Sequence, residues 1–142
     1  MKTVQIKKKN STPGLHSITL EVQDALKKLL QKDSTSSSGV VHLFNMHTSS
    51  ALLINESWDD SAKGDLERFF NYIAPENLPF IEHTLEGPDD SPAHMKTALL
   101  NQHLALIVED SQMLLGRWQG IFLAEFRDDP PTRTILLKYQ PD

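Results

Sequence analysis

Residues 40–56 read VVHLFNMHTSSALLINE, and they decide the fold because they hold two short runs that are typical of β-strands. Alternation in the first run predicts a strand over 40–46. A second apolar run, ALLIN, follows the polar residues HTSS. His47 therefore stands at the end of one strand, where a rigid scaffold can present a reactive side chain. The residues on one predicted face of the first strand are Val40, His42, Phe44 and Met46.

Helical spacing occurs on both sides of these two strands. Behind a Ser/Thr cap, apolar residues recur every three to four positions from Ser17, which predicts an amphipathic helix. A second stripe predicts a helix over 58–74 that ends at Pro75, with acidic residues in its first turn. The stripes consist of Ile18, Val22, Leu26, Leu29 and Leu30, and of Trp58, Ala62, Leu66, Phe69, Phe70 and Ile73.

A short third helix is expected after a long loop. Residues 75–92 contain four prolines and a GPDD turn, and loops of this length in a compact domain are usually functional or disordered. Ser91 and Pro92 have the character of an N-cap and a first helical residue, so they predict a helix that runs through Leu100. The stretch DSTSSSG at 33–39 is too short for a domain linker and joins elements within one domain.

Strands are expected at both ends of the chain. Val4 and Ile6 alternate with polar neighbours and predict the first one. Three more fit 103–109, 113–126 and 132–139, and the long one should bend at Gly116 or Gly120. Because the helices come early and the strands cluster late, the order favours an α+β fold, with residues 1–142 as a single domain.

Composition excludes several classes of function. The chain has no cysteine, so any transition-metal site must be built from His, Asp and Glu. A net charge of −5 is the wrong sign for a protein that binds mainly a phosphate backbone, so no nucleic-acid partner is expected. The N-terminal lysines precede no apolar signal region, and no run approaches the roughly 18 apolar residues of a membrane span. We expect a cytoplasmic protein with no membrane partner.

Three histidines in polar settings suggest a metal site. His47 opens HTSSALLINE, while His83 and His94 bracket the acidic residues of the GPDD turn. Imidazole is the commonest metal ligand in proteins, and three nitrogens with one open position leave room for water or substrate. His94 falls in the first turn of a predicted helix, where the helix dipole favours the neutral, ligating form. The alternatives are a strand-end histidine bonded to its neighbours and an acidic loop with a capping histidine.

Other polar residues have less distinctive surroundings. His42 is expected to be a core or interface histidine, and His16 and His103 are expected to have structural or surface roles. Glu125 alternates with apolar residues, so it should be either at an edge or paired. Arg117 and Arg133 could hold an anionic substrate, although surface salt bridges are the usual role of such residues.

Several motifs in order resemble the YjbQ family (UPF0047), whose members are often labelled secondary thiamine-phosphate synthases. They are GLHSITLEV at 14–22, HTSSALLINE at 47–56, the HxxEG loop at 83–87, PAHMKTALL at 92–100 and LLGRWQGIFLAEF at 114–126. The resemblance implies a two-layer β-sandwich with flanking helices, assembled as a homotrimer with sites near subunit boundaries. It also implies a shared histidine set of His47, His83 and His94, with Asn55, Glu56, Asp90 and Gln119 at the family's other polar positions.

Two classes of function remain open. In the first, the three histidines hold a divalent ion, Glu56 or Asp90 is the general base, and Asn55, Arg117 and Gln119 bind a small phosphorylated metabolite. Imidazole donors suit Zn²⁺, or Ni²⁺ or Co²⁺, better than Mg²⁺, so the thiamine-phosphate synthase activity is expected to be secondary. In the second, the trimer binds a metal or metabolite without turnover, or a closed structural metal joins its subunits.

Overall fold

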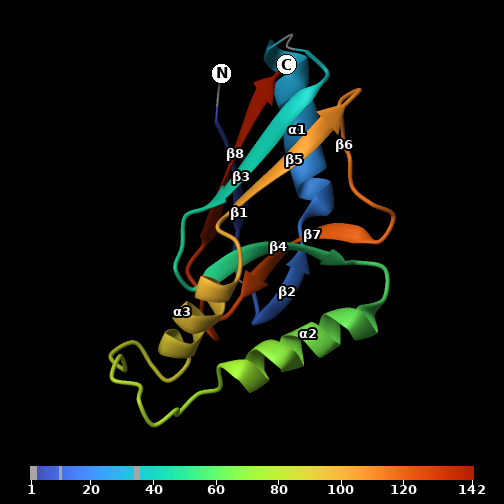
Figure 1. Cartoon of the computed structure of the whole chain (residues 1–142). Helices are drawn as coiled ribbons and strands as arrows, with labels where there is room; N and C mark the ends of the chain where they lie inside the picture. The colour runs from blue at the N-terminus through green and yellow to red at the C-terminus, as the bar shows by residue number, and fades with distance from the viewer. Residues whose placement is uncertain (1–2, 10, 34–35) are drawn as a thin grey trace.

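Two antiparallel sheets carry the fold of the computed structural model, which describes residues 3–9, 11–33 and 36–142 (Figure 1). The five-stranded sheet has the order β1-β8-β3-β5-β6, and the three-stranded sheet has the order β2-β7-β4. In chain order, the helices and strands of the whole fold are β1 (Val4–Lys8), β2 (Gly14–Ser17), α1 (Thr19–Asp33), β3 (Gly39–Asn45), β4 (Ser50–Glu56), α2 (Asp60–Ile73), α3 (Asp90–Leu99), β5 (His103–Glu109), β6 (Gln112–Met113), β7 (Gln119–Glu125) and β8 (Arg133–Pro141).

The main core lies between α1 and the inner face of the five-stranded sheet. Apolar residues at the helical spacing of α1, such as Val22 and Leu26, pack with Val41 and Leu43 of β3. Residues of the three-stranded sheet, including Leu123, belong to the same cluster, so both sheets contribute to one core. Burial of this surface, at roughly 25 cal/mol per Å², is the main force that holds the layers together.

The other face of the three-stranded sheet packs on α2 and α3. Figure 1 shows both helices at the end of the molecule where this sheet lies. Phe70 of α2 meets Phe126 edge to face, with ring centroids 5.8 Å apart, and Ala93 of α3 is fully buried in the same cluster. Because strand side chains alternate between faces, β4 and β7 are covered on both sides.

The predicted α+β class is confirmed, as are most of the elements. The strand expected over 113–126 is wrong in its first half: β6 ends at Met113 and β7 begins at Gln119. A turn separates them, in which Gln119 N donates to Gly116 O and Gly116 N donates to Gln119 Oε1. Here glycine marks the end of one strand rather than a bend inside it.

Helix starts also differ from the sequence expectation. Ser17 is the last residue of β2, a strand that was not predicted, and α1 begins at Thr19. Helix α2 begins after Asp59, whose side chain accepts from Ser61 N and so caps it, which leaves Trp58 outside. Helix α3 begins at Asp90 rather than Pro92, because Ala93 N already donates to Asp89 O. Ser34 and Thr35, in the predicted connection, lie outside the described residues.

Among the residues that the structure describes, no helix or loop covers the outer face of the five-stranded sheet. Val40 of β3 lies opposite Ile107 of β5, and Phe44 lies opposite Leu136 of β8, so apolar residues of three strands adjoin there. Ile107 is 63% exposed and Phe44 is 48% exposed. Between them His42 stacks on His103, with ring centroids 5.2 Å apart, so His42 lies outside the core of this chain.

Within residues 3–9, 11–33 and 36–142, we find no helix with the length and apolar character that crossing a membrane requires.

Candidate functional site

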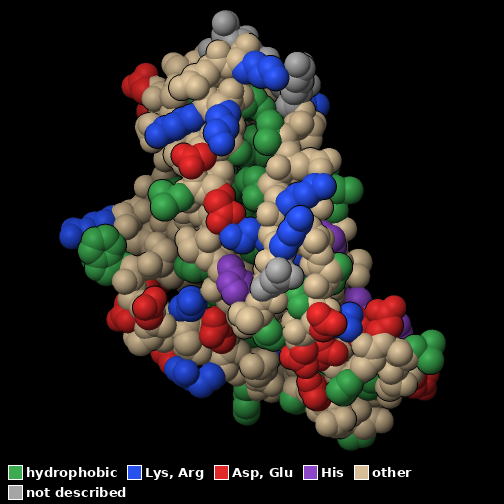
Figure 2. All heavy atoms as spheres, turned by 180° about the vertical axis from the view of Figure 1, so that it is seen from behind, with side chains coloured by type: hydrophobic (Ala, Val, Ile, Leu, Met, Phe, Trp, Pro, Cys, Tyr) green, Lys and Arg blue, Asp and Glu red, His purple; other side chains and the backbone are tan. Residues whose placement is uncertain are grey.

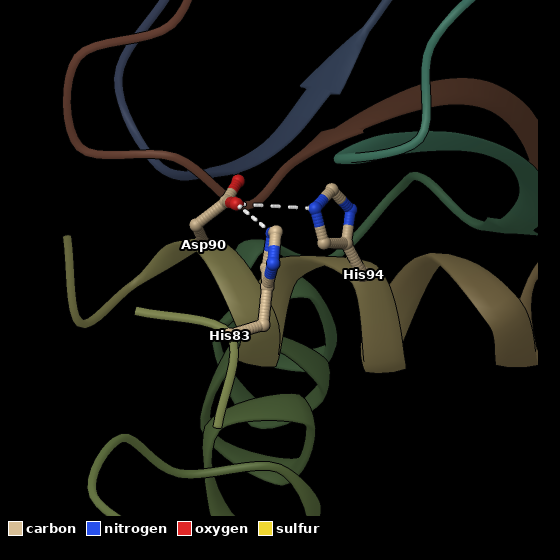
Figure 3. A group of neighbouring side chains, drawn as sticks. All are labelled: His83, Asp90 and His94. Carbon is tan, nitrogen blue, oxygen red and sulfur yellow. Dashed lines mark hydrogen bonds and ion pairs between the residues drawn. The ribbon is translucent and has the colours of Figure 1, made fainter. Parts of the chain in front are cut away.

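Two histidines and one aspartate converge at the N-terminal end of α3. Figure 3 shows both imidazole rings directed at the carboxylate of Asp90, His94 from the next turn of the helix and His83 from the preceding loop. The Oδ2 atom of Asp90 lies 2.8 Å from His83 Nε2 and 3.2 Å from His94 Nε2. One donor atom from each residue lies within 4.8 Å of the others, as a shared metal ion would require.

A backbone contact fixes the orientation of the His94 ring. His94 Nδ1 lies 2.7 Å from the carbonyl oxygen of Thr48, and a carbonyl can only accept, so we assign the hydrogen to Nδ1. In the neutral ring, Nε2 then presents a lone pair towards an oxygen of Asp90. Two such atoms repel each other unless a proton or a metal cation lies between them. Histidine ligands of metals usually donate their other N–H in this way.

The third predicted ligand, His47, lines the same open pocket but is not part of the converging group. The pocket has a volume of about 630 Å³ and is lined by His47, His83 and His94 together with Thr48, Ser91, Thr97 and Gln102. His47 Nε2 accepts a hydrogen bond from Thr134 N at 2.8 Å, so its lone pair is already engaged. The pKa of His47 is lowered by burial and, in the same direction, by the charge of Arg133.

Arg127, which sequence reasoning missed, holds Asp90 in place. Its Nε donates to Asp89 Oδ2 at 2.9 Å, one terminal nitrogen donates to Asp90 Oδ1 at 2.7 Å, and the other donates to the carbonyl of Glu86. Asp90 is 1% exposed, so its charge depends on these partners. Arg127 thereby ties the His83 loop to the helix that carries His94. In the sequence, an arginine after a strand and before DDPP carries no signal for this role.

A buried ion pair lies behind His47. Arg133 donates through Nε and a terminal nitrogen to the two carboxylate oxygens of Glu125, at 2.7 and 2.5 Å, and both side chains are at least 99% buried. Arg133 also donates to the Ser49 hydroxyl and carbonyl. Glu125 is therefore paired, as one of its two predicted alternatives, whereas a surface salt bridge or anion site at Arg133 is wrong.

The remaining predicted residues lie at the opposite end of the three-stranded sheet. Asn55 and Glu56 close β4, which spans about 20 Å from Ser50 at roughly 3.3 Å per residue. Glu56 accepts from the backbone N–H groups of Trp58 and Asp59. Arg117 stacks on the ring of Trp118, and Gln119 binds Gly116 N. Within one chain, these four residues are not brought to the histidine pocket.

The donor set fits a transition-metal ion. Two imidazole nitrogens and one carboxylate oxygen suit Zn²⁺ and related ions, and bonds of about 2.0–2.1 Å at tetrahedral angles put donor atoms about 3.3 Å apart. The His94 contact of 3.2 Å matches this spacing, and the His83 contact of 2.8 Å would need only a small adjustment. With three protein donors, such a site keeps an open position.

Comparisons with known proteins agree on one family. A family model described as "UPF0047 protein YjbQ-like" matches residues 2–142. The UPF0047 protein YjbQ of Salmonella typhimurium is 39% identical over 127 residues, which cover 89% of this chain and 88% of that protein. The UPF0047 protein YugU of Bacillus subtilis is 34% identical over 138 residues and 97% of each chain.

A solved structure supports the same assignment. The conserved hypothetical protein TT1486 from Thermus thermophilus superposes with a TM-score of 0.82 at 34% identity, covering 96% of this chain and 99% of the other. Sequence and fold therefore agree over nearly the full length, and the chain belongs to the UPF0047 protein YjbQ-like family.

Proposed function

We propose that the histidine pocket holds a divalent transition-metal ion and supports hydrolysis or group transfer on a small phosphorylated metabolite. The observation that carries this proposal is the approach of two imidazole Nε2 atoms to one oxygen of buried Asp90, while His94 Nδ1 is bonded to Thr48 O. His83, His94 and Asp90 would hold the ion. Zn²⁺ fits the donors best, Ni²⁺ or Co²⁺ are acceptable, and Mg²⁺ prefers oxygen.

Residues of the pocket wall have distinct tasks in this proposal. A divalent ion held by His83, His94 and Asp90 would supply Lewis acidity and a water of lowered pKa. Thr48, Ser91 and Gln102 offer hydroxyl and amide groups that can orient a phosphate. His47, whose Nε2 accepts from Thr134 N, has its hydrogen on Nδ1 and can act as a donor. Arg127 donates to Asp90 and fixes the position of its carboxylate.

A synthase that joins a pyrimidine diphosphate to a thiazole phosphate is the weaker reading. Such a reaction develops charge on the leaving diphosphate, which Mg²⁺ and basic side chains usually neutralise. In the part of the chain that the structure describes, no Lys or Arg side chain lines the histidine pocket. We therefore propose that the thiamine-phosphate synthase activity implied by the family label is secondary.

The working form that we propose is a homotrimer. The family resemblance motivates it, and the uncovered apolar face around Ile107 and Phe44 is a surface that a second copy could bury. Glu56, Asn55, Arg117 and Gln119 would then act in catalysis or substrate binding only across a subunit boundary. Within one chain, Asp90 is better placed as a ligand than as a general base.

Metal binding is tested first, on protein purified without an affinity tag. Elemental analysis should find about one transition-metal ion per chain, and titration with Zn²⁺ should show that His94→Ala and Asp90→Asn each lose affinity at least about tenfold, because each removes one donor. His16→Ala, outside the pocket, is the matched control. Less than a tenth of an equivalent, with no effect of His94→Ala, contradicts the metal site. Iron in place of zinc would point to the Fe(II) chemistry that two His and one carboxylate also support.

Turnover is tested separately with the metal-loaded protein and p-nitrophenyl phosphate. Release of p-nitrophenol that His94→Ala abolishes supports catalysis on phosphate esters. Tight metal binding without turnover of this or other phosphate esters favours the non-catalytic binding protein. Spectroscopy of the Co²⁺-substituted protein that shows four protein donors favours a structural metal between subunits.

A further inference from the structure

A second cavity lies on the other side of α3 from the histidine pocket. Its volume is about 380 Å³, within the range of small-molecule sites of roughly 300–1,000 Å³. Pro92 and Lys96 line it, whereas Ser91 and His94 line the histidine pocket. Residues four apart share one face of a helix, and those two positions away face roughly the other side, so α3 separates the two spaces.

One wall of this cavity is apolar and rigid. Leu15 of β2, Phe70 of α2 and Phe126 after β7 contribute to it, and each is at least 91% buried. The Phe70 and Phe126 rings meet at 78° with centroids 5.8 Å apart. These side chains come from three different elements that the core holds together, so this wall is preformed. It suits a hydrocarbon or aromatic group of a ligand.

Lys96 brings hydrogen-bond donors that the protein leaves unused. It is 7% exposed, its amino group donates to Asn71 Oδ1 at 2.8 Å, and it lies 5.6 Å from the centre of the Phe126 ring. An ammonium group carries three N–H bonds, and in the described part of the chain Asn71 is its one hydrogen-bond acceptor. Buried donors are normally satisfied, so two remaining N–H groups call for an acceptor in the cavity.

Apart from Lys96, the charged residues of the lining are all acidic. Glu67, Glu76 and Asp128 line the cavity and form no ion pair within the described residues, while Asp89 and Glu125 are neutralised by arginines. These three carboxylates, of which Glu67 accepts one hydrogen bond from Leu15 N at 2.9 Å, outnumber the single ammonium group and leave an excess of negative charge. Burial lowers the pKa of Lys96, while Glu76, Asp128 and Asp89 act in the opposite direction, so the field of these carboxylates reaches the cavity. Figure 2 shows acidic side chains gathered at the lower right, near the end that holds the long loop.

We propose that this cavity binds a small amino acid with an apolar side chain. The carboxylate of the ligand accepts from Lys96, and the side chain of the ligand lies against Phe70 and Phe126. The ammonium group of the ligand meets the carboxylates of Glu67, Glu76 and Asp128. A simple carboxylate would be repelled by the acidic lining, and a simple amine would leave the Lys96 donors unsatisfied. A zwitterion satisfies both sets of groups.

Calorimetric titration of the intact protein with three ligands that share a phenylethyl group tests this proposal. Free phenylalanine should bind at least about tenfold more tightly than 2-phenylethylamine, which lacks the carboxylate, and than 3-phenylpropanoate, which lacks the amine. Binding should persist in His94→Ala, which separates this cavity from the metal site. Failure of phenylalanine to bind at millimolar concentration, or equal binding of either analogue, overturns the proposal.

Two variants locate the binding groups. Lys96→Met keeps the length of the side chain but removes the donors, so the advantage of phenylalanine over 2-phenylethylamine should disappear. Glu67→Gln should weaken both amines and leave 3-phenylpropanoate unchanged or slightly tighter. Lys28→Met, at an exposed position of α1, is the control. Thermal melting verifies that each variant is folded, and unchanged phenylalanine affinity in folded Lys96→Met and Glu67→Gln overturns the assignment.

Discussion

Single residues behave in ways that their sequence neighbours do not reveal. Glu125 and Arg133 are eight positions apart, and the sequence predicts Glu125 to be at an edge or paired without indicating its partner, yet the two residues form a buried pair. Only the placement of β8 in one sheet and β7 in the other brings them into contact. By contrast, the sequence indicated a polar site at His83, His94 and Asp90. Histidines that bracket a loop of prolines and acidic residues are not typical of a buried core.

At this scale, His47 yields a prediction on pH. Burial and Arg133 lower its pKa in the folded state below the ordinary value, so the unfolded state binds more protons between the two values. Its contribution to stability is therefore complete above about pH 6.5 and is lost as the pH falls towards the folded pKa. With a chelator present, the free energy of unfolding should fall less between pH 8 and pH 5 in His47→Asn than in the wild type. The difference between the two slopes should correspond to less than one proton. His16→Asn, outside the pocket, should retain the wild-type slope.

Elements were predicted well where periodicity was strong and poorly where a side chain decides the end. The stripe of α1 and the alternation in β3 predicted the right type of element, because a buried face imposes its period on the sequence. The break between β6 and β7 depends on Gln119 binding the backbone of Gly116, and β2 is only four residues long. Neither leaves a period to detect.

The loop before α3 depends on Arg127, and this gives a prediction at the scale of elements. Lysine cannot reproduce three directed contacts, so Arg127→Lys should loosen the loop and weaken Zn²⁺ binding about 10–100-fold, the usual effect of removing a partner of a metal ligand. Arg68→Lys, which alters an exposed pair with Asp65, is the control and should not change the affinity. Competition with a chromophoric chelator measures both, and equal affinities would rule out the positioning role.

At the scale of the whole molecule, the two faces of the five-stranded sheet differ in what packs on them. One face packs on α1, while the other presents Val40, Phe44 and Ile107 to the outside. A sequence can indicate an apolar face, but it does not say whether the same chain or another copy buries it. This is why assembly rests on resemblance to a family, whereas the class of fold followed from the order of elements.

The trimer can be tested by a change of charge on this face. Ile107→Glu places three carboxylates in the interface of a closed trimer, and burying them unpaired is costly, so the variant should sediment as a monomer. Leu20→Glu, at an 81% exposed position of α1, should sediment like the wild type. Analytical ultracentrifugation distinguishes these states, and a monomeric wild type would remove the basis for a shared site.

Helix α3 separates the histidine pocket from the second cavity, and Asp89, its N-cap, and Asp90, its first residue, contact different sides. Asp89 lines the second cavity, Asp90 contacts the two histidines His83 and His94 that line the other pocket, and the guanidinium of Arg127 binds both carboxylates. Two carboxylates and one guanidinium group therefore connect the histidine pocket to the second cavity. If a ligand in one of them changes the affinity of the other through this contact, the second ligand must change the affinity for the first by the same factor. An amino acid and a metal ion would then each alter the binding of the other.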